Sequence, residues 1–130
     1  MPVTVERLPN EPIILAHLWG IIDISCIREM YERSVPILDE IGGPVWRITD
    51  ALEVESTFSD VVQILGKIAS DTPGSTTDPR VKSVLVGTNQ WVKLVADSVQ
   101  QRQYGSLNIP LFETRDEALL FARVKIAEKQ

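Results

Sequence analysis

The sequence has a single cysteine, Cys26, and a single histidine, His17. One cysteine excludes an intramolecular disulfide framework, so we expect a reducing, cytoplasmic compartment. His17 has no cysteine or second histidine at a spacing that would complete a metal site or a catalytic pair. We therefore expect His17 to be structural and Cys26 to be a small core residue, and we predict no metal and no cofactor.

Basic charge and long apolar runs are also scarce. The 13 Lys and Arg residues are outnumbered by 18 Asp and Glu residues, which gives a net charge of −5. No short window is rich in Lys or Arg, and this argues against a nucleic-acid partner. The apolar runs are far shorter than the roughly 20 residues that span a bilayer, so no transmembrane segment is predicted. The first residues also lack the basic and apolar regions of a signal peptide.

The residues that are present suit one globular α/β domain spanning residues 1–130. Apolar periodicity and turn residues predict five strands, at residues 3–8, 13–19, 45–49, 81–86 and 109–112. Four helices are predicted: from Asp23 or Ser25 to Ile41, over residues 57–70, over residues 89–103, and from Thr114 to the C-terminus. Gly20 should end the second strand, and Pro36 should kink the first helix or split it in two.

These elements follow the order ββαβαβαβα. The first two strands are joined by a short turn and should form an antiparallel hairpin. Every later strand is followed by a helix, which favours parallel strands joined by right-handed crossovers. The sequence therefore predicts a mixed, mostly parallel five-stranded sheet with four helices. Residues 71–80, which are rich in turn formers, are expected to form an exposed, mobile loop that tolerates change.

The stretch from Pro44 to Asp60 is where we place the candidate site, because a strand runs there into a helix. Asp50 should close the strand, and a short acidic loop should follow it. Ser56 and Thr57 then open the helix, where we favour simple capping; the alternative is a phosphorylation or anion site at the free amides. The acidic residues Glu53, Glu55 and Asp60 would repel an anion. Together with Asp50 they suit a solvated loop better than a cation site.

The three tryptophans are the remaining candidates. Trp46 lies in the central strand and is expected to be core. Trp19 ends a strand and Trp91 opens a helix, so two interpretations of each residue stay open. Each tryptophan either packs in the ordinary way or lies half-exposed at a ligand pocket or a dimer face.

The element order, the chain length and the placement of Ser56 and Thr57 resemble the SpoIIAA-like fold. This is the fold of STAS domains, which are named for sulfate transporters and anti-sigma-factor antagonists. The ending IPLFETRDEALLFAR is similar to the last strand and helix of SpoIIAA-like bacterial proteins. One departure concerns the Asp-Ser-Ser-Gly type motif of the antagonists. Asp50 can match its aspartate, but Ser-Ser-Gly is absent and Ser56 stands six residues further on.

The resemblance implies a non-enzymatic regulatory module that acts by binding protein partners, with Asp50, Ser56 and Thr57 as surface candidates. The alternative is a carrier of a small apolar ligand or lipid, held between sheet and helices near Trp19 or Trp91. An enzyme using Asp50 and the acidic loop is a third hypothesis that we do not favour. We also predict a homodimer, because three tryptophans and the run LLFARVKIA leave apolar surface to cover.

Overall fold

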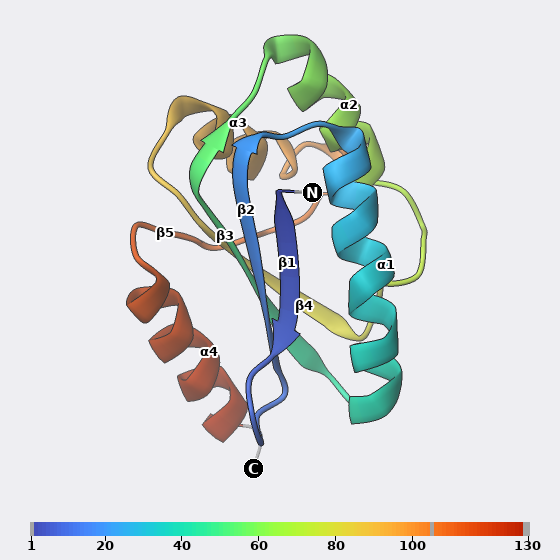
Figure 1. Ribbon diagram of the computed structural model, residues 1–130, viewed down its shortest axis with the longest axis vertical. Coiled ribbons are helices and arrows are strands. Elements are labelled where there is room, and N and C mark those ends of the chain that lie inside the picture. The colour runs from blue at the N-terminus through green and yellow to red at the C-terminus, as the bar shows by residue number, and fades with distance from the viewer. Residues whose placement is uncertain (1, 105, 129–130) are drawn as a thin grey trace.

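The five strands of the sheet lie side by side in the order in which they occur along the chain (Figure 1). The computed structural model describes residues 2–104 and 106–128. The strands are β1 (Val3–Arg7), β2 (Ile13–Ile21), β3 (Val45–Glu55), β4 (Val81–Val86) and β5 (Leu111–Phe112). The helices are α1 (Ile24–Ile41), α2 (Phe58–Ile68), α3 (Gln90–Ser98) and α4 (Arg115–Glu128), with a 3₁₀ turn at Arg102–Tyr104.

The strand pairing confirms the predicted order ββαβαβαβα and the mixed, mostly parallel sheet. β1 pairs antiparallel with β2, whereas β2–β3, β3–β4 and β4–β5 are parallel pairs. Helices α1, α2 and α3 cover one face of the sheet and α4 covers the other (Figure 1). No helix in the described ranges is both long enough and apolar enough to cross a membrane.

Alternation along the strands divides the core between the two faces. The layer against α4 contains Ile13, Leu15, Ile48, Val84 and Val86, which pack on Ala118 and Ala122. The layer against the other helices is larger and contains Ala16, Leu18, Ala51 and Val54 from the sheet, with Ile27, Met30, Ile64, Leu65 and Val92 from the helices. The two layers explain the continuous apolar run of residues 13–16 at the start of β2, because both faces of this strand are buried there.

Two predictions about strand ends are wrong. Residues 51–55, expected to form a loop after Asp50, continue β3, since Glu53 pairs opposite Trp19 of β2 and Glu55 opposite Ile21. β2 is longer for the same reason and runs through Gly20, whose φ of 73° a glycine adopts without strain. The register shifts between His17 and Trp19 because of a bulge. The supposed acidic loop is therefore the end of the central strand.

Helix α1 does not split at Pro36. It continues to Ile41, since Leu38 is fully buried against β2 and β3 and holds the last turn in place. Gly42 ends it in the left-handed conformation, with φ of 74°. At the other end the Asp23 side chain accepts hydrogen bonds from the amides of Ser25 and Cys26, as the sequence predicts.

The last third of the chain is less regular than predicted. α3 ends at Ser98 and β5 has only two residues. α4 begins after Thr114, whose hydroxyl accepts from the Glu117 amide at 3.1 Å and donates to its carboxylate at 3.0 Å. Thr114 and Glu117 thus form a capping box at the predicted start of the last helix. Residues 129–130, included in the predicted helix, lie outside the described residues.

Candidate functional site

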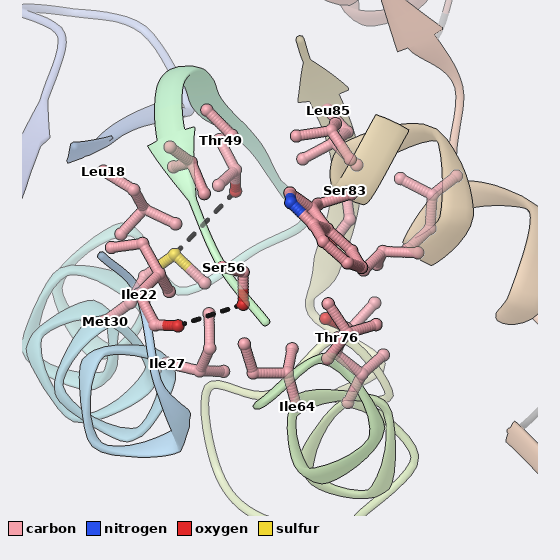
Figure 2. Close-up of a pocket in the computed structure, with 18 of the residues that line it drawn as sticks. Leu18, Ile22, Ile27, Met30, Thr49, Ser56, Ile64, Thr76, Ser83 and Leu85 are labelled. Atoms are coloured by element: carbon pink, nitrogen blue, oxygen red, sulfur yellow. Dashed lines mark hydrogen bonds between the residues drawn. The ribbon is translucent and has the colours of Figure 1, made fainter. Parts of the chain in front are cut away.

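A cavity of about 100 Å³ lies between the sheet and helices α1, α2 and α3. Figure 2 shows Leu18, Ile22 and Met30 facing Ser83 and Leu85 across it, with Ile64 of α2 nearby. The remaining lining residues are Ile27, Tyr31, Arg47, Thr49, Ala51, Val54, Ser56, Val61, Ile68, Thr76, Val84, Trp91, Val92, Val95 and Ile109. Most of them are aliphatic or aromatic, so the lining suits an apolar molecule.

The walls of the cavity are fixed by specific local interactions. Thr57 caps α2 by accepting from the Asp60 amide at 3.1 Å, and Asn89 caps α3 by accepting from the Val92 amide at 3.0 Å. The Asn89 amide also donates to the Val54 carbonyl at 2.6 Å, which ties α3 to β3. A Cβ on Gly87 would lie 2.6 Å from a methyl of Val92, so this loop approaches α3 too closely for any other residue.

Residues 71–80 close one side of the cavity and are not the exposed, change-tolerant loop that their composition suggests. Gly74, Ser75 and Asp78 are buried. The Asp78 carboxylate accepts from the Gly74 amide at 2.8 Å and from the Arg80 guanidinium at 2.9 and 3.2 Å. Hydrogen bonds from Arg80 are the main reason why the pKa of Asp78 lies well below its usual range. The loop is a structural part of the core.

A few polar side chains face the mostly apolar space. The Tyr31 hydroxyl forms a hydrogen bond with the Thr76 hydroxyl at 3.0 Å, and Thr49 donates to the Met30 sulfur at 3.8 Å. Arg47 is fully buried, and its guanidinium lies 5.0 Å from the centre of the Tyr31 ring. Burial is the main cause that lowers the pKa of Arg47 and raises the pKa of Tyr31.

Two of the predicted site residues, Ser56 and Trp91, line this cavity. Ser56 is half-buried, and its hydroxyl donates to the Ile22 carbonyl at 3.3 Å at the end of β2 (Figure 2). Trp91 is half-buried in the first turn of α3. Thr57 stands next to Ser56 but is exposed, and its side chain is engaged as the cap of α2.

Asp50 lies on the opposite face of the sheet, away from the cavity. Its carboxylate accepts from the Arg115 guanidinium at 2.7 and 3.0 Å and from the Leu52 amide at 3.1 Å. Asp50 thereby links the central strand to the first turn of α4. In the described ranges the acidic residues around it do not gather into a group that could hold a metal ion.

Trp19 also points away from the cavity, toward the side of the sheet covered elsewhere by α4. Its ring packs against His17, with ring centroids 5.1 Å apart. The His17 Nε2 atom lies 3.5 Å from a carboxylate oxygen of Glu53 on the neighbouring strand. His17 is thus half-buried and paired on the sheet, and Cys26 is buried in the core, where burial raises the pKa of its thiol.

Sequence reasoning missed the polar residues that the cavity brings together, above all Arg47 and Ser83. A signal was available, since Arg47 is the one charged residue in the apolar run of residues 45–49. Alternation places it on the opposite side of the strand from Trp46 and Ile48, facing the helices. A charged residue at a core position calls for a specific partner.

Comparison with known proteins gives matches to solved structures only. No protein-family model matches the chain, and no curated protein does. An anti-sigma factor antagonist from Mycobacterium paratuberculosis superposes with a TM-score of 0.59 at 15% identity, over 93% of this chain and 92% of its own. An uncharacterised DUF3478 protein from Shewanella loihica PV-4, described as having a SpoIIAA-like fold, gives 0.58 at 12% identity over 92% and 90%.

A third structure agrees with these two. The anti-sigma factor antagonist SpoIIAA, in its unphosphorylated form, superposes with a TM-score of 0.55 at 13% identity, over 95% of this chain and 97% of its own. The three superpositions cover nearly the whole chain and share its strand and helix order. The chain therefore has the SpoIIAA-like fold of STAS domains.

Proposed function

We propose that this chain is a non-enzymatic binding module, and that its ligand is a small apolar molecule held between the sheet and helices α1 to α3. The observation that carries the proposal is the apolar cavity of about 100 Å³ inside the larger of the two core layers. Protein cores are normally packed with few such voids, and this one, at about two thirds of the roughly 150 Å³ that holds benzene, suits a short aliphatic chain. Trp91, Val95 and Ile109 are half-buried, which puts this side of the cavity next to solvent.

Binding can be followed at a single atom, because the chain contains only two methionines and Met30 lines the cavity. Protein labelled with ¹³C at the methionine methyl groups should be titrated with 1-hexanol. We expect the Met30 methyl signal to shift and to saturate as 1-hexanol is added. A Met30 signal that never moves would overturn the proposed function.

A cavity-filling variant provides the matched control. Ala51 lines the cavity from β3, and Ala51→Leu adds carbon atoms to the empty space. We expect this variant to remain folded, because filling a void adds apolar contacts, and to lose the hexanol response. Undiminished hexanol binding by a folded Ala51→Leu protein would place the ligand elsewhere.

A second candidate function, binding of a protein partner, is favoured by the outer side of α2. Phe58 and Val62 lie one turn apart on this helix and are 68% and 43% exposed. The acidic residues Glu55 and Asp60 lie beside them in the sequence. Charge complementarity therefore favours a protein with an apolar groove bordered by Lys or Arg, because a second acidic copy of this patch would be repelled. Val61 and Ile64 of the same helix line the cavity, so α2 connects the two surfaces.

A photo-crosslinking amino acid placed at residue 58 in the native cells tests this second function. We expect it to capture a protein that then rebinds the purified chain, and we expect binding to weaken in high salt and in Phe58→Ser. Phe112→Ser would be a poor control, because Phe112 packs in the α4 layer. Leu52→Ser is a better control, since Leu52 is 39% exposed on β3, outside α2. Equal binding by the Phe58 and Leu52 variants would exclude α2 as the docking face.

A further inference from the structure

Arg47 occupies the centre of the sheet without a complete set of partners. Only 1% of its surface is exposed. One terminal nitrogen, Nη1, donates to the Gly74 carbonyl and to the Ser34 hydroxyl, the latter at 3.3 Å. Within the described part of the chain, Nε and Nη2 have no hydrogen-bond partner. A guanidinium has five N–H donors, so the one on Nε and the two on Nη2 are left unused.

The two unused nitrogens are the ones that suit a carboxylate. Nε and Nη2 form one edge of the planar guanidinium, and their N–H bonds point in parallel toward the same side. A carboxylate accepts two parallel hydrogen bonds from such an edge, in a bidentate pair that is stronger than a bond between neutral groups. A charge buried without such a partner is costly, which makes a vacant edge unusual.

The protein does not supply that carboxylate from its described residues, none of which forms an ion pair with Arg47. Asp78 is the acidic residue whose charge acts on Arg47. Its two oxygens are already held by Arg80, at 2.9 and 3.2 Å, and by the Gly74 amide at 2.8 Å. The Nε–Nη2 edge of Arg47 is therefore buried without an anionic partner from the described part of the chain.

Ser83 provides an independent second observation. It stands directly opposite Arg47 on the neighbouring strand β4, so both side chains emerge on the same face of the sheet. The Ser83 hydroxyl is buried and also lacks a partner among the described residues. Both residues line the cavity, whose other walls are mostly apolar. An unsatisfied cation and an unsatisfied hydroxyl thus lie side by side at one wall of an apolar cavity.

From this arrangement we infer that the cavity binds a small apolar monocarboxylate, with its carboxylate on the Nε–Nη2 edge of Arg47 and the Ser83 hydroxyl, and its hydrocarbon part against the aliphatic and aromatic lining. The inference deepens the proposed function and rests on it. The cavity volume of about 100 Å³, below the roughly 150 Å³ of a cavity that holds benzene, limits the ligand to a short aliphatic acid. Longer acyl chains would exceed the space that the lining encloses.

The test compares hexanoate with 1-hexanol, which has a similar chain but no charge. Both are titrated into the methionine-labelled protein and followed at the Met30 methyl. We expect hexanoate to bind at least about tenfold more tightly than hexanol, since hydrogen bonds to charged groups are the strong ones. Arg47→Met should abolish this preference while keeping hexanol binding, which shows that the cavity persists. Replacing a buried ion by an apolar residue of similar volume is often tolerated.

A second variant keeps the inference testable if Arg47→Met fails to fold. Ser83→Ala should weaken hexanoate binding several-fold more than it weakens hexanol binding, because the hydrogen bond to the charged carboxylate is the stronger one. Equal affinity of the wild type for both molecules, or an undiminished hexanoate preference in a folded Arg47→Met protein, would overturn the inference and leave the apolar cavity as a ligand site. If neither compound shifts Met30, the proposed function itself fails. The two failures are thus distinguishable.

Discussion

Gly74 shows how much one residue of the loop at 71–80 constrains the core. Its φ is 78°, and a Cβ there would lie 2.4 Å from the Tyr31 carbonyl oxygen and 3.0 Å from a methyl of Val35. Gly74 also accepts a hydrogen bond from Arg47, so its position helps to orient the guanidinium at the cavity. The position therefore requires glycine for two reasons, backbone conformation and space.

We predict that Gly74→Ala lowers the free energy of unfolding by about 2–4 kcal/mol, through left-handed strain and steric clash together. Chemical denaturation measures this directly. Gly66→Ala is the matched control, because Gly66 is an exposed residue inside α2 and a Cβ there meets no atom within 4 Å. The control should gain about 0.5–1 kcal/mol of stability. Similar behaviour of the two variants would contradict this account of Gly74.

Substitutions at Thr57 test whether this residue only caps α2 or belongs to a phosphorylation switch. Its hydroxyl accepts from the Asp60 amide at 3.1 Å, so Thr57→Ala should cost about 0.5–2 kcal/mol of stability. Thr57→Asp should be nearly silent, because Asp is itself a good cap. Stoichiometric phosphate at Ser56, Thr57 or Ser59 in protein from its native cells, found by mass spectrometry, would favour the switch instead.

Asp78 should make stability depend on pH in the acid range. Its folded-state pKa lies below the unfolded value of about 3.9, so the ionised carboxylate stabilises the folded chain. That contribution is complete above the unfolded pKa and is lost as pH falls below it toward the folded pKa. Denaturation at neutral pH should show Asp78→Asn much less stable than wild type. The difference should shrink below about pH 4, whereas Asp71→Asn, at an exposed residue, should change little at either pH.

At the scale of elements, α4 is held to the sheet by aromatic contacts. Trp46 of β3, expected to be core, is only half-buried; it meets Phe121 of α4 edge to face, with ring centroids 5.7 Å apart, and Phe112 lies 5.2 Å from the same ring. Trp46→Ala should therefore cost about 3–5 kcal/mol, as for other large aromatic truncations. A soluble Trp46→Ala protein with unchanged melting would contradict the central role of this contact. Trp19→Ala, at a residue that does not line the cavity, should cost less.

The length of β3 decides where the candidate residues lie. Its last five residues were expected to form a loop, which would have put Asp50 and Ser56 together at one edge of the sheet. As a strand with a register shift after Asp50, the same stretch presents residues to both faces of the sheet. Asp50 turns toward Arg115 on the α4 side, while Ser56 follows the strand end and turns toward the cavity. Because this stretch is a strand and not a loop, the two predicted site residues lie on opposite faces of the sheet, Asp50 on the α4 side and Ser56 at the cavity.

At the scale of the whole molecule, self-association stays a prediction. Leu120 and Val124 lie one turn apart on the outer side of α4 and are 66% and 48% exposed. We predict a homodimer in sedimentation experiments at roughly tens of micromolar, where a micromolar Kd already populates the dimer. Leu120→Glu should shift the equilibrium toward monomer if this stripe is the contact. Wild-type protein that sediments only as a monomer would contradict the prediction.

The sequence by itself determined the order of elements and hence the fold, because period-2 and period-3.6 apolar patterns, turn residues and capping residues are local signals. The caps at Asp23, Thr57 and Thr114 were predicted for the same reason. The cavity was decided only by the tertiary structure. The cavity depends on how α1, α2, α3 and the loop at 71–80 pack against the sheet. No local sequence pattern predicts how completely the side chains of these elements fill the space between them. The pairing of Arg47 with Ser83 likewise required the register of β3 against β4, which joins residues 36 positions apart in the chain.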